Sequence, residues 1–213
     1  MKVENNGEEK LEEIIDSNLL ILSGGVLKNY NKGEYIFKEG QQPQFYHQVI
    51  QGKVRMVNES DEGKEFIQGF FTAGHSFGEP PLFIPAPYPA SAIAAEPSVI
   101  IRLNITSLTL LLKENFNVHW SITRILSQRI RNKSITLREI TSRNPFERVI
   151  FLLNNYKADS IKNGTNGAQK IKIDYTRQQI ADMCGLRVET VIRVMRNLHH
   201  KKVLTIEKGK VFY

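Results

Sequence analysis

The sequence holds a single cysteine, Cys184, among its 213 residues. One thiol excludes an internal disulfide framework and a structural zinc site built on several thiolates. It is also typical of a reducing compartment. Apolar runs such as LLILSGGVL are too short to span a bilayer, and the polar, acidic N-terminal residues do not resemble a signal peptide. We therefore expect a soluble, cytoplasmic protein that does not use a membrane.

Sequence motifs of the common enzyme classes are also missing. The chain has no Gly-rich phosphate loop, no His/Asp/Glu cluster with the spacing of metal ligands and no nucleophile elbow. The sequence therefore predicts a protein that is not an enzyme and assigns no metal site.

Acidic residues are scarce in the C-terminal part of the chain, although the net charge of +7 is moderate. Residues 1–116 carry 10 Lys/Arg against 15 Asp/Glu, residues 117–143 carry six against one, and residues 144–213 carry 13 against six. This asymmetry favours a nucleic-acid partner for the C-terminal part, although a solvated basic face has the same composition.

The first half of the chain has the pattern of a β-rich domain. A short amphipathic helix is expected over residues 8–22. Glycines then recur about every eleven residues, at Gly40, Gly52, Gly63 and Gly74, between short runs rich in aromatic and β-branched residues. Such spacing is typical of an antiparallel β sandwich or roll, with Asp61-Glu62-Gly63 as a hairpin turn.

A helical pattern begins at about Thr106, because residues 106–140 contain neither proline nor glycine, and a long helix is expected within it over Val118–Ile140. One face of it repeats at steps of 4, 3, 4 and 3 through Leu126, Ile130, Lys133, Leu137 and Ile140. This is a heptad seam with one polar position. We predict that its four apolar residues join two chains in a homodimer, although a helix buried within its own subunit has the same pattern.

The helix has a second apolar face and a defined end. Trp120, Ile122 and Ile125 lie off the seam and are expected to pack onto the β domain. Asn144-Pro145 ends the helix, since the residue before a proline avoids the helical region. A further helix over Phe146–Tyr156, a polar loop and the short strand KIKI are expected next.

The segment RQQIADMCGLRVETVIRVMR, Arg177 to Arg196, has the pattern of a helix-turn-helix. Ala181 at its fifth position lets the two helices approach, and Gly185 at its ninth permits the left-handed turn. The shared core is expected from five apolar residues: Ile180, Cys184, Leu186, Val191 and Val194. Thr176 and Gln179 form a capping box. LTIEKGKVFY then predicts a hairpin, or wing, that turns at Lys208-Gly209.

The second helix of the motif is expected to expose Val188, Glu189, Thr190 and Arg193. In a major groove a carboxylate accepts a hydrogen bond from cytosine, and an arginine donates to guanine. Glu189 and Arg193, four residues apart, therefore suit adjacent base pairs, although a surface ion pair has the same spacing. The predicted DNA contacts are Thr176, Arg177, Gln178, Arg187, Val188, Glu189, Thr190, Arg193 and Lys208.

With these motifs the chain resembles the Crp/Fnr superfamily of bacterial transcription regulators over residues 25–213. The resemblance implies an α+β protein in three parts. These are a cyclic-nucleotide-binding-like β-roll (a double-stranded β-helix) over residues 1–116, a dimerisation helix over 117–143 and a winged helix-turn-helix over 144–213.

The resemblance also implies a DNA site. Glu189 and Arg193 match the family residues that read a TGA core. Val188 stands where the cyclic-AMP-receptor type has an arginine, which is similar to the Fnr type, but Ile192 replaces the Fnr-type serine. A palindrome of the TTGA–TCAA kind is expected, with half-sites about one helical turn apart. The loop Asp159–Gln169 corresponds to a region where some members contact RNA polymerase.

In members that bind cyclic AMP, a Gly-Glu pair holds the ribose, an Arg-Ser pair the phosphate and a Thr-Ser pair the base. Gly78, Glu79, Ser91 and Ser134 match, but Ala90 and Lys133 replace the arginine and the threonine. Because a buried charge without its partner costs about 2–5 kcal/mol, we predict that cyclic AMP is not the effector. The cysteines of an Fnr-type iron–sulfur cluster are also missing.

The sequence therefore does not identify the effector. Haem is one alternative, which would make the protein a gas or redox sensor, with His47, His75 and His119 as candidate ligands. The proline-rich segment around Pro80–Pro89 either shapes a pocket for another small molecule or fills the cavity. A non-specific architectural DNA binder is a further alternative, against which the base-reading Glu189 argues.

Overall fold

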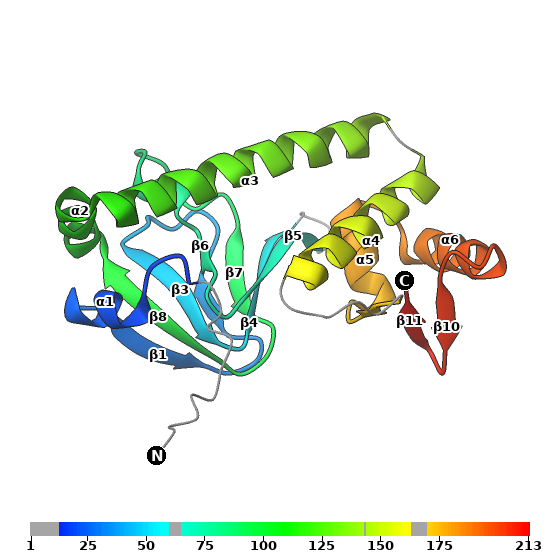
Figure 1. Ribbon diagram of the computed structural model, residues 1–213, viewed down its shortest axis with the longest axis horizontal. Coiled ribbons are helices and arrows are strands. Elements are labelled where there is room, and N and C mark those ends of the chain that lie inside the picture. Colours follow the sequence, from blue (N-terminus) through cyan, green and yellow to red (C-terminus); the bar gives the residue numbers. More distant parts are fainter. Residues whose placement is uncertain (1–12, 60–64, 143, 163–169) are drawn as a thin grey trace, which may run out of the picture. The chain divides into compact units, whose positions relative to one another are not determined.

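The computed structural model describes residues 13–59, 65–142, 144–162 and 170–213. It divides the chain into two compact units, Met1–Arg55 with Phe70–Ile125 and Met56–Gly69 with Leu126–Tyr213. Helices and strands both contribute, so the predicted α+β class is confirmed (Figure 1). The predicted turn at Asp61-Glu62-Gly63 and most of the predicted polymerase-contact loop lie outside the described residues.

Two four-stranded sheets form the β-roll, with the orders β1-β8-β3-β6 and β2-β7-β4-β5. The strands of the first sheet pair antiparallel throughout, as β2 and β7 do in the second. The strands are β1 (Val26–Tyr30), β2 (Tyr35–Phe37), β3 (Phe45–Gln51), β4 (Lys53–Glu59), β5 (Glu65–Thr72), β6 (Ser76–Phe77), β7 (Ser91–Ala94) and β8 (Ser98–Asn104).

Short helices flank the strands of the first unit: α1 (Ser17–Leu22), the 3-10 helix η1 (Pro80–Leu82) and α2 (Ile105–Glu114). The α1 helix is shorter than the predicted 8–22. Asp16 starts it, because the Asp16 carboxylate accepts hydrogen bonds from the backbone N–H groups of Asn18 and Leu19. The segment rich in proline forms η1 and a turn rather than a strand, since proline donates no hydrogen bond to a sheet.

The long helix α3 (Phe116–Ser142) has 27 residues and extends two residues beyond the predicted Val118–Ile140 at each end. Ile122 is buried, as predicted, but Trp120 is 59% exposed and stacks on Phe116. The prediction that Trp120 packs onto the β domain is therefore wrong. At about 100° per residue, positions 120 and 122 point to nearly opposite sides of a helix, so they cannot both face one surface.

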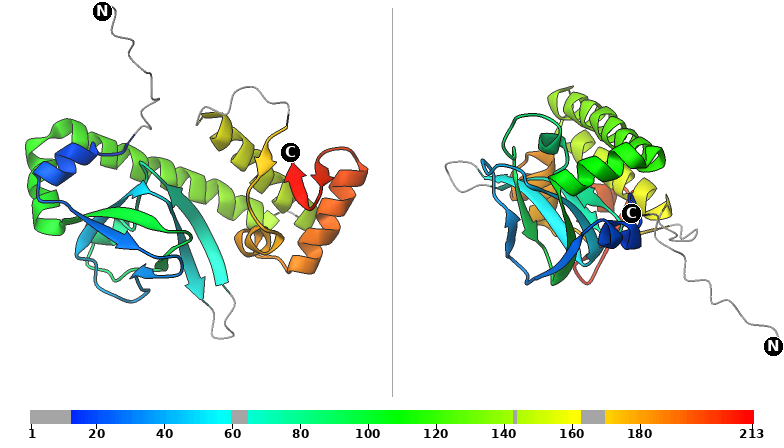
Figure 2. Two further views of the ribbon diagram at one scale, coloured as in Figure 1. Left: turned by 90° about the horizontal axis from the view of Figure 1, so that it is seen from below. Right: turned by 90° about the vertical axis from the view of Figure 1, so that its left-hand side faces the viewer.

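The C-terminal part of the second unit is a winged helix-turn-helix (Figures 1 and 2). Its elements are α4 (Pro145–Lys162), β9 (Lys172–Ile173), α5 (Arg177–Cys184), α6 (Val188–His200), β10 (Thr205–Glu207) and β11 (Lys210–Phe212). The strands form an antiparallel sheet in the order β10-β11-β9. Helix α4 extends past the predicted end at Tyr156, because no proline or glycine follows before Gly164.

Candidate DNA interface and effector end of the β-roll

The helix-turn-helix has the local geometry that its sequence predicts. The Thr176 hydroxyl accepts a hydrogen bond from the Gln179 backbone N–H (3.1 Å), and the Gln179 side chain accepts one from the Thr176 N–H (2.8 Å). This completes the capping box at the start of α5. Gly185 ends α5 in the left-handed conformation, with φ of 61°, which glycine adopts without strain.

A buried core holds α5 and α6 together. Ile180, Ala181, Cys184 and Val191 are buried, and Val149 and Leu153 of α4 join the same cluster. Leu186 is half-buried and packs against this core. Because three helices meet here, the exposed face of α6 is fixed by packing on its opposite side.

The exposed face of α6 carries Glu189 and Arg193, which line a shallow hollow together with Ile192 and Arg196. Arg196 was not predicted as a contact, although its spacing of three from Arg193 places it on the same face. The predicted exposure of Val188 and Thr190 is wrong, because both residues are half-buried, and Val188 packs against the core. It precedes buried Val191 by three residues and therefore shares its side of the helix.

The other predicted DNA contacts surround this face. Thr176 and Arg187 stand at the N-caps of α5 and α6, and Gln178 is exposed and donates a hydrogen bond to Asp182 (2.7 Å). Burial lowers the pKa of Arg177. Lys208 and Gly209, with φ of 46° and 79°, make the turn between β10 and β11, so the predicted wing is confirmed.

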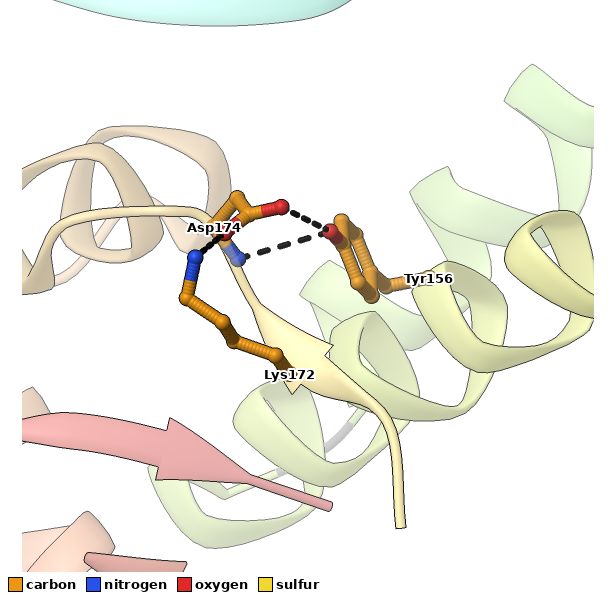
Figure 3. Close-up of polar contacts among 3 residues, drawn as sticks. All are labelled: Tyr156, Lys172 and Asp174. Carbon is orange, nitrogen blue, oxygen red and sulfur yellow. Dashed lines mark hydrogen bonds and ion pairs between the residues drawn. The ribbon is translucent and has the colours of Figure 1, made fainter. Parts of the chain in front are cut away.

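A polar network ties α4 to the strand that precedes the motif (Figure 3). The Tyr156 hydroxyl accepts a hydrogen bond from the Asp174 backbone N–H (3.4 Å) and donates to the Asp174 carboxylate (3.5 Å). Lys172 Nζ lies 2.5 Å from the other carboxylate oxygen. Burial raises the pKa of Tyr156, so its hydroxyl stays protonated at neutral pH. The network fixes the chain two residues before the Thr176 cap.

The predicted effector residues divide between the two units. Gly78, Glu79 and Ala90 belong to the first unit and are buried. Ser91 Oγ accepts a hydrogen bond from the Glu39 backbone N–H (3.0 Å). Lys133 and Ser134 lie exposed on α3 in the second unit, where Lys133 Nζ donates to Gln68 (3.2 Å).

The three histidines considered for haem have different surroundings. His47 is 3% exposed and lies between phenylalanine rings, and burial, with a smaller effect from the Arg102 charge, lowers its pKa to about 3. His75 and His119 are exposed. Within the described part of the chain, no group of three or more His, Cys, Asp or Glu residues is arranged to hold a metal ion.

The predicted dimer seam is mostly exposed. Ile130 and Leu137 are 68% and 64% exposed, whereas Leu126 is half-buried. The side chain of Ile140 lies outside the described residues.

A β-roll, a long helix and a winged helix-turn-helix in one chain define a DNA-binding regulator. A family model described as "Cyclic nucleotide-binding domain" matches residues 27–115, and one described as "Crp-like helix-turn-helix domain" matches residues 147–212. The chain belongs to the Crp/Fnr superfamily of transcription regulators, which are not enzymes.

Within the described residues, none of the helices combines the length and the apolar character needed to cross a bilayer.

Curated relatives are distant but cover most of the chain. The fumarate and nitrate reduction regulatory protein of Yersinia pestis is 25% identical over 86% of this chain and 72% of its own. The CRP-like cAMP-activated global transcriptional regulator of Mycobacterium tuberculosis is 22% identical over 86% and 81%. The c-di-GMP responsive regulator CLP of Xanthomonas campestris shares the fold, with a TM-score of 0.77 at 19% identity over 92% and 98%.

Proposed function

We propose that this regulator binds a palindromic, TGA-containing DNA site as a homodimer. The observation that carries this proposal is the exposed pair Glu189 and Arg193, four residues apart on α6. Their spacing suits a cytosine and a guanine on neighbouring base pairs. Because Val188 packs against the core, Glu189 and Arg193 are the side chains that we propose read the bases. The proposed limits of the three parts are residues 1–116, 117–143 and 144–213.

Selection from random DNA tests the proposed site. We expect the selected sequences to contain two TGA half-sites in inverted orientation, about one helical turn apart. Binding of all sequences with similar affinity, at a steep salt dependence, would instead support the alternative of an architectural DNA binder. A selected motif without TGA would overturn the assignment of Glu189 and Arg193.

The proposed dimer contact keeps Ile130 and Leu137 of the predicted seam but not Leu126, which is half-buried, or Lys133, which is charged. It is a stripe on α3 that contains exposed apolar residues and no charge. It runs through Phe116, Trp120, Thr123, Ser127, Ile130, Ser134 and Leu137. The steps alternate between four and three residues, as two helices need to stay in contact. Large exposed apolar side chains in such a row are typical of an interface, and small Ser and Thr side chains allow close approach.

Replacing Ile130 and Leu137 together with aspartate is expected to give a monomer. Two carboxylates in each chain would be buried at the contact without partners, which costs several kcal/mol. Sedimentation velocity measures the mass, and operator affinity should fall about 100-fold or more because one half-site is lost. Asn132→Asp, exposed on another side of α3, is the matched control and should remain a dimer. A dimeric double variant would contradict the proposal.

We propose further that the effector is not cyclic AMP. Ala90 is buried where a phosphate-binding arginine would be needed, and no cationic side chain replaces it at that position. A calorimetric titration that gave micromolar binding of cyclic AMP would contradict this.

The haem alternative stays a prediction, and the visible absorption spectrum of the purified protein tests it. Contact with RNA polymerase also stays a prediction, which a pull-down with RNA polymerase tests.

A further inference from the structure

Four aromatic rings occupy the interior of the β-roll, and we call them the ring cluster. They are Phe37 of β2, His47 of β3, Phe77 of β6 and Tyr88, three residues before β7. Phe37 and Tyr88 stack with 3.7 Å between ring centroids and 8° between planes. The His47 ring lies 5.4 Å from both Phe37 and Phe77. All four residues are at most 5% exposed, so the rings bridge the two sheets as packed core.

The ring cluster lies directly against the predicted effector residues. Gly78 has φ of +73°, and a Cβ added there would lie 2.7 Å from Phe37 Cζ and 3.2 Å from Tyr88 Cε1. The next residue, Glu79, is fully buried, as is Ala90. The Ser91 hydroxyl is engaged by the Glu39 backbone N–H. The residues predicted to hold an effector in this unit are therefore covered by the chain itself.

The backbone on both sides of Tyr88 is anchored. The Tyr88 N–H donates to Gln41 O and its carbonyl accepts from Gly40 N–H, both at 2.9 Å. Pro87 and Pro89 flank it and restrict the backbone further. Phe37 pairs with Ala92 between β2 and β7. The backbones that carry the two stacked rings, Phe37 and Tyr88, are therefore both fixed by pairing with neighbouring segments.

We propose that the side chains of the ring cluster fill the interior of the β-roll, where a small molecule would otherwise bind. The protein then binds its operator without a small-molecule effector. This rests on the proposed operator binding and concerns how it is regulated. A ligand that entered between the sheets would have to expel a buried ring. Exposing one such ring lowers ligand affinity by about 10- to 150-fold. The residues present therefore do not fit a cyclic nucleotide, although the family model for that domain matches.

The first test uses the full chain purified without added ligand. We expect its operator affinity to change less than about twofold with cyclic AMP, cyclic GMP or cyclic di-GMP, and its Tm to stay constant. A native mass spectrum should give the mass of the protein alone. Operator binding that needs one of these nucleotides, or a co-purifying metabolite, would overturn the proposal.

The second test removes the Phe37 ring. Phe37→Ala leaves an apolar space beside Tyr88, and such engineered cavities bind benzene. We expect a lower Tm and weaker operator binding, both restored by millimolar benzene. Phe83→Ala is the control, because Phe83 is exposed and should show no benzene response. If Phe37→Ala does not fold, Phe37→Leu gives a smaller space and a partial response. A folded variant with unchanged operator binding and no benzene response would contradict the proposal.

The two tests separate this proposal from the proposed function. Operator binding that appears only with a small-molecule extract of cells would leave the function standing and overturn the ring cluster as occupant. A selection that yields no operator, with or without that extract, would overturn the function itself.

Discussion

Replacing Arg193 with alanine is expected to lower the affinity for a TGA-containing operator by about 5- to 150-fold at each half-site. A bidentate contact to guanine discriminates by about 1–3 kcal/mol, and a dimer loses two of them. The arginine is exposed on α6 beside Glu189, within a helix that its core holds in place. Fluorescence anisotropy with the operator and with operators changed at the single guanine measures both affinity and discrimination. The variant should no longer distinguish them.

Lys208→Ala is the matched control for this experiment. Lys208 lies at the turn of the wing, where a lysine meets phosphate rather than a base edge. Its loss should weaken binding to all sequences alike and reduce the salt slope by about 1 for each half-site, or about 2 for the dimer. If Arg193→Ala behaves in this way instead, Arg193 contacts the DNA backbone and does not read a base.

Lowering the pH from 7 to 5 is expected to destabilise the first unit by about 2 kcal/mol through His47 alone. Its pKa is lowered from 6.5 to about 3, by burial first and then by the Arg102 charge. Below pH 6.5 the unfolded chain therefore takes up a proton at this histidine that the folded chain refuses. The free energy of unfolding falls as pH drops from 6.5 towards 3, and above pH 6.5 this group has no effect.

Urea unfolding followed by circular dichroism at pH 7 and pH 5 measures the effect. His47→Phe keeps a flat ring beside Phe77 and cannot be protonated, so its stability should fall by about 2 kcal/mol less than that of the parent over this range. The other titrating groups, including those near Arg102, are present in both proteins. Their contributions therefore cancel when the two changes in the free energy of unfolding are compared. Equal losses in the two proteins would mean that another group is responsible.

The DNA-binding motif was predictable because its interactions are local. The capping box of Thr176 and Gln179, the left-handed Gly185 and the core positions all lie within 20 residues. A sequence pattern therefore carries nearly all the information that the fold uses there. The exception is Val188, the first residue of α6, whose side chain direction depends on where the helix begins.

The interior of the β-roll could not be predicted in the same way. Phe37 and Gly78 are 41 residues apart, and only the strand pairing brings them into contact. Alternation along a strand predicts which residues point inward but not which ring they meet. In α3 the heptad pattern identified apolar faces but not which one its own β domain covers. Trp120 was therefore assigned to the wrong side.

The single thiol of the chain has a practical consequence. Cys184 is buried in the core of the helix-turn-helix, and burial raises its pKa to about 12. At pH 8 this thiol is therefore protonated and unreactive, and it is also shielded from solvent. An alkylating reagent should therefore modify the native protein only when the DNA-binding part transiently opens. The rate of Cys184 alkylation therefore reports how often the DNA-binding part opens, and mass spectrometry can follow this rate without an engineered label.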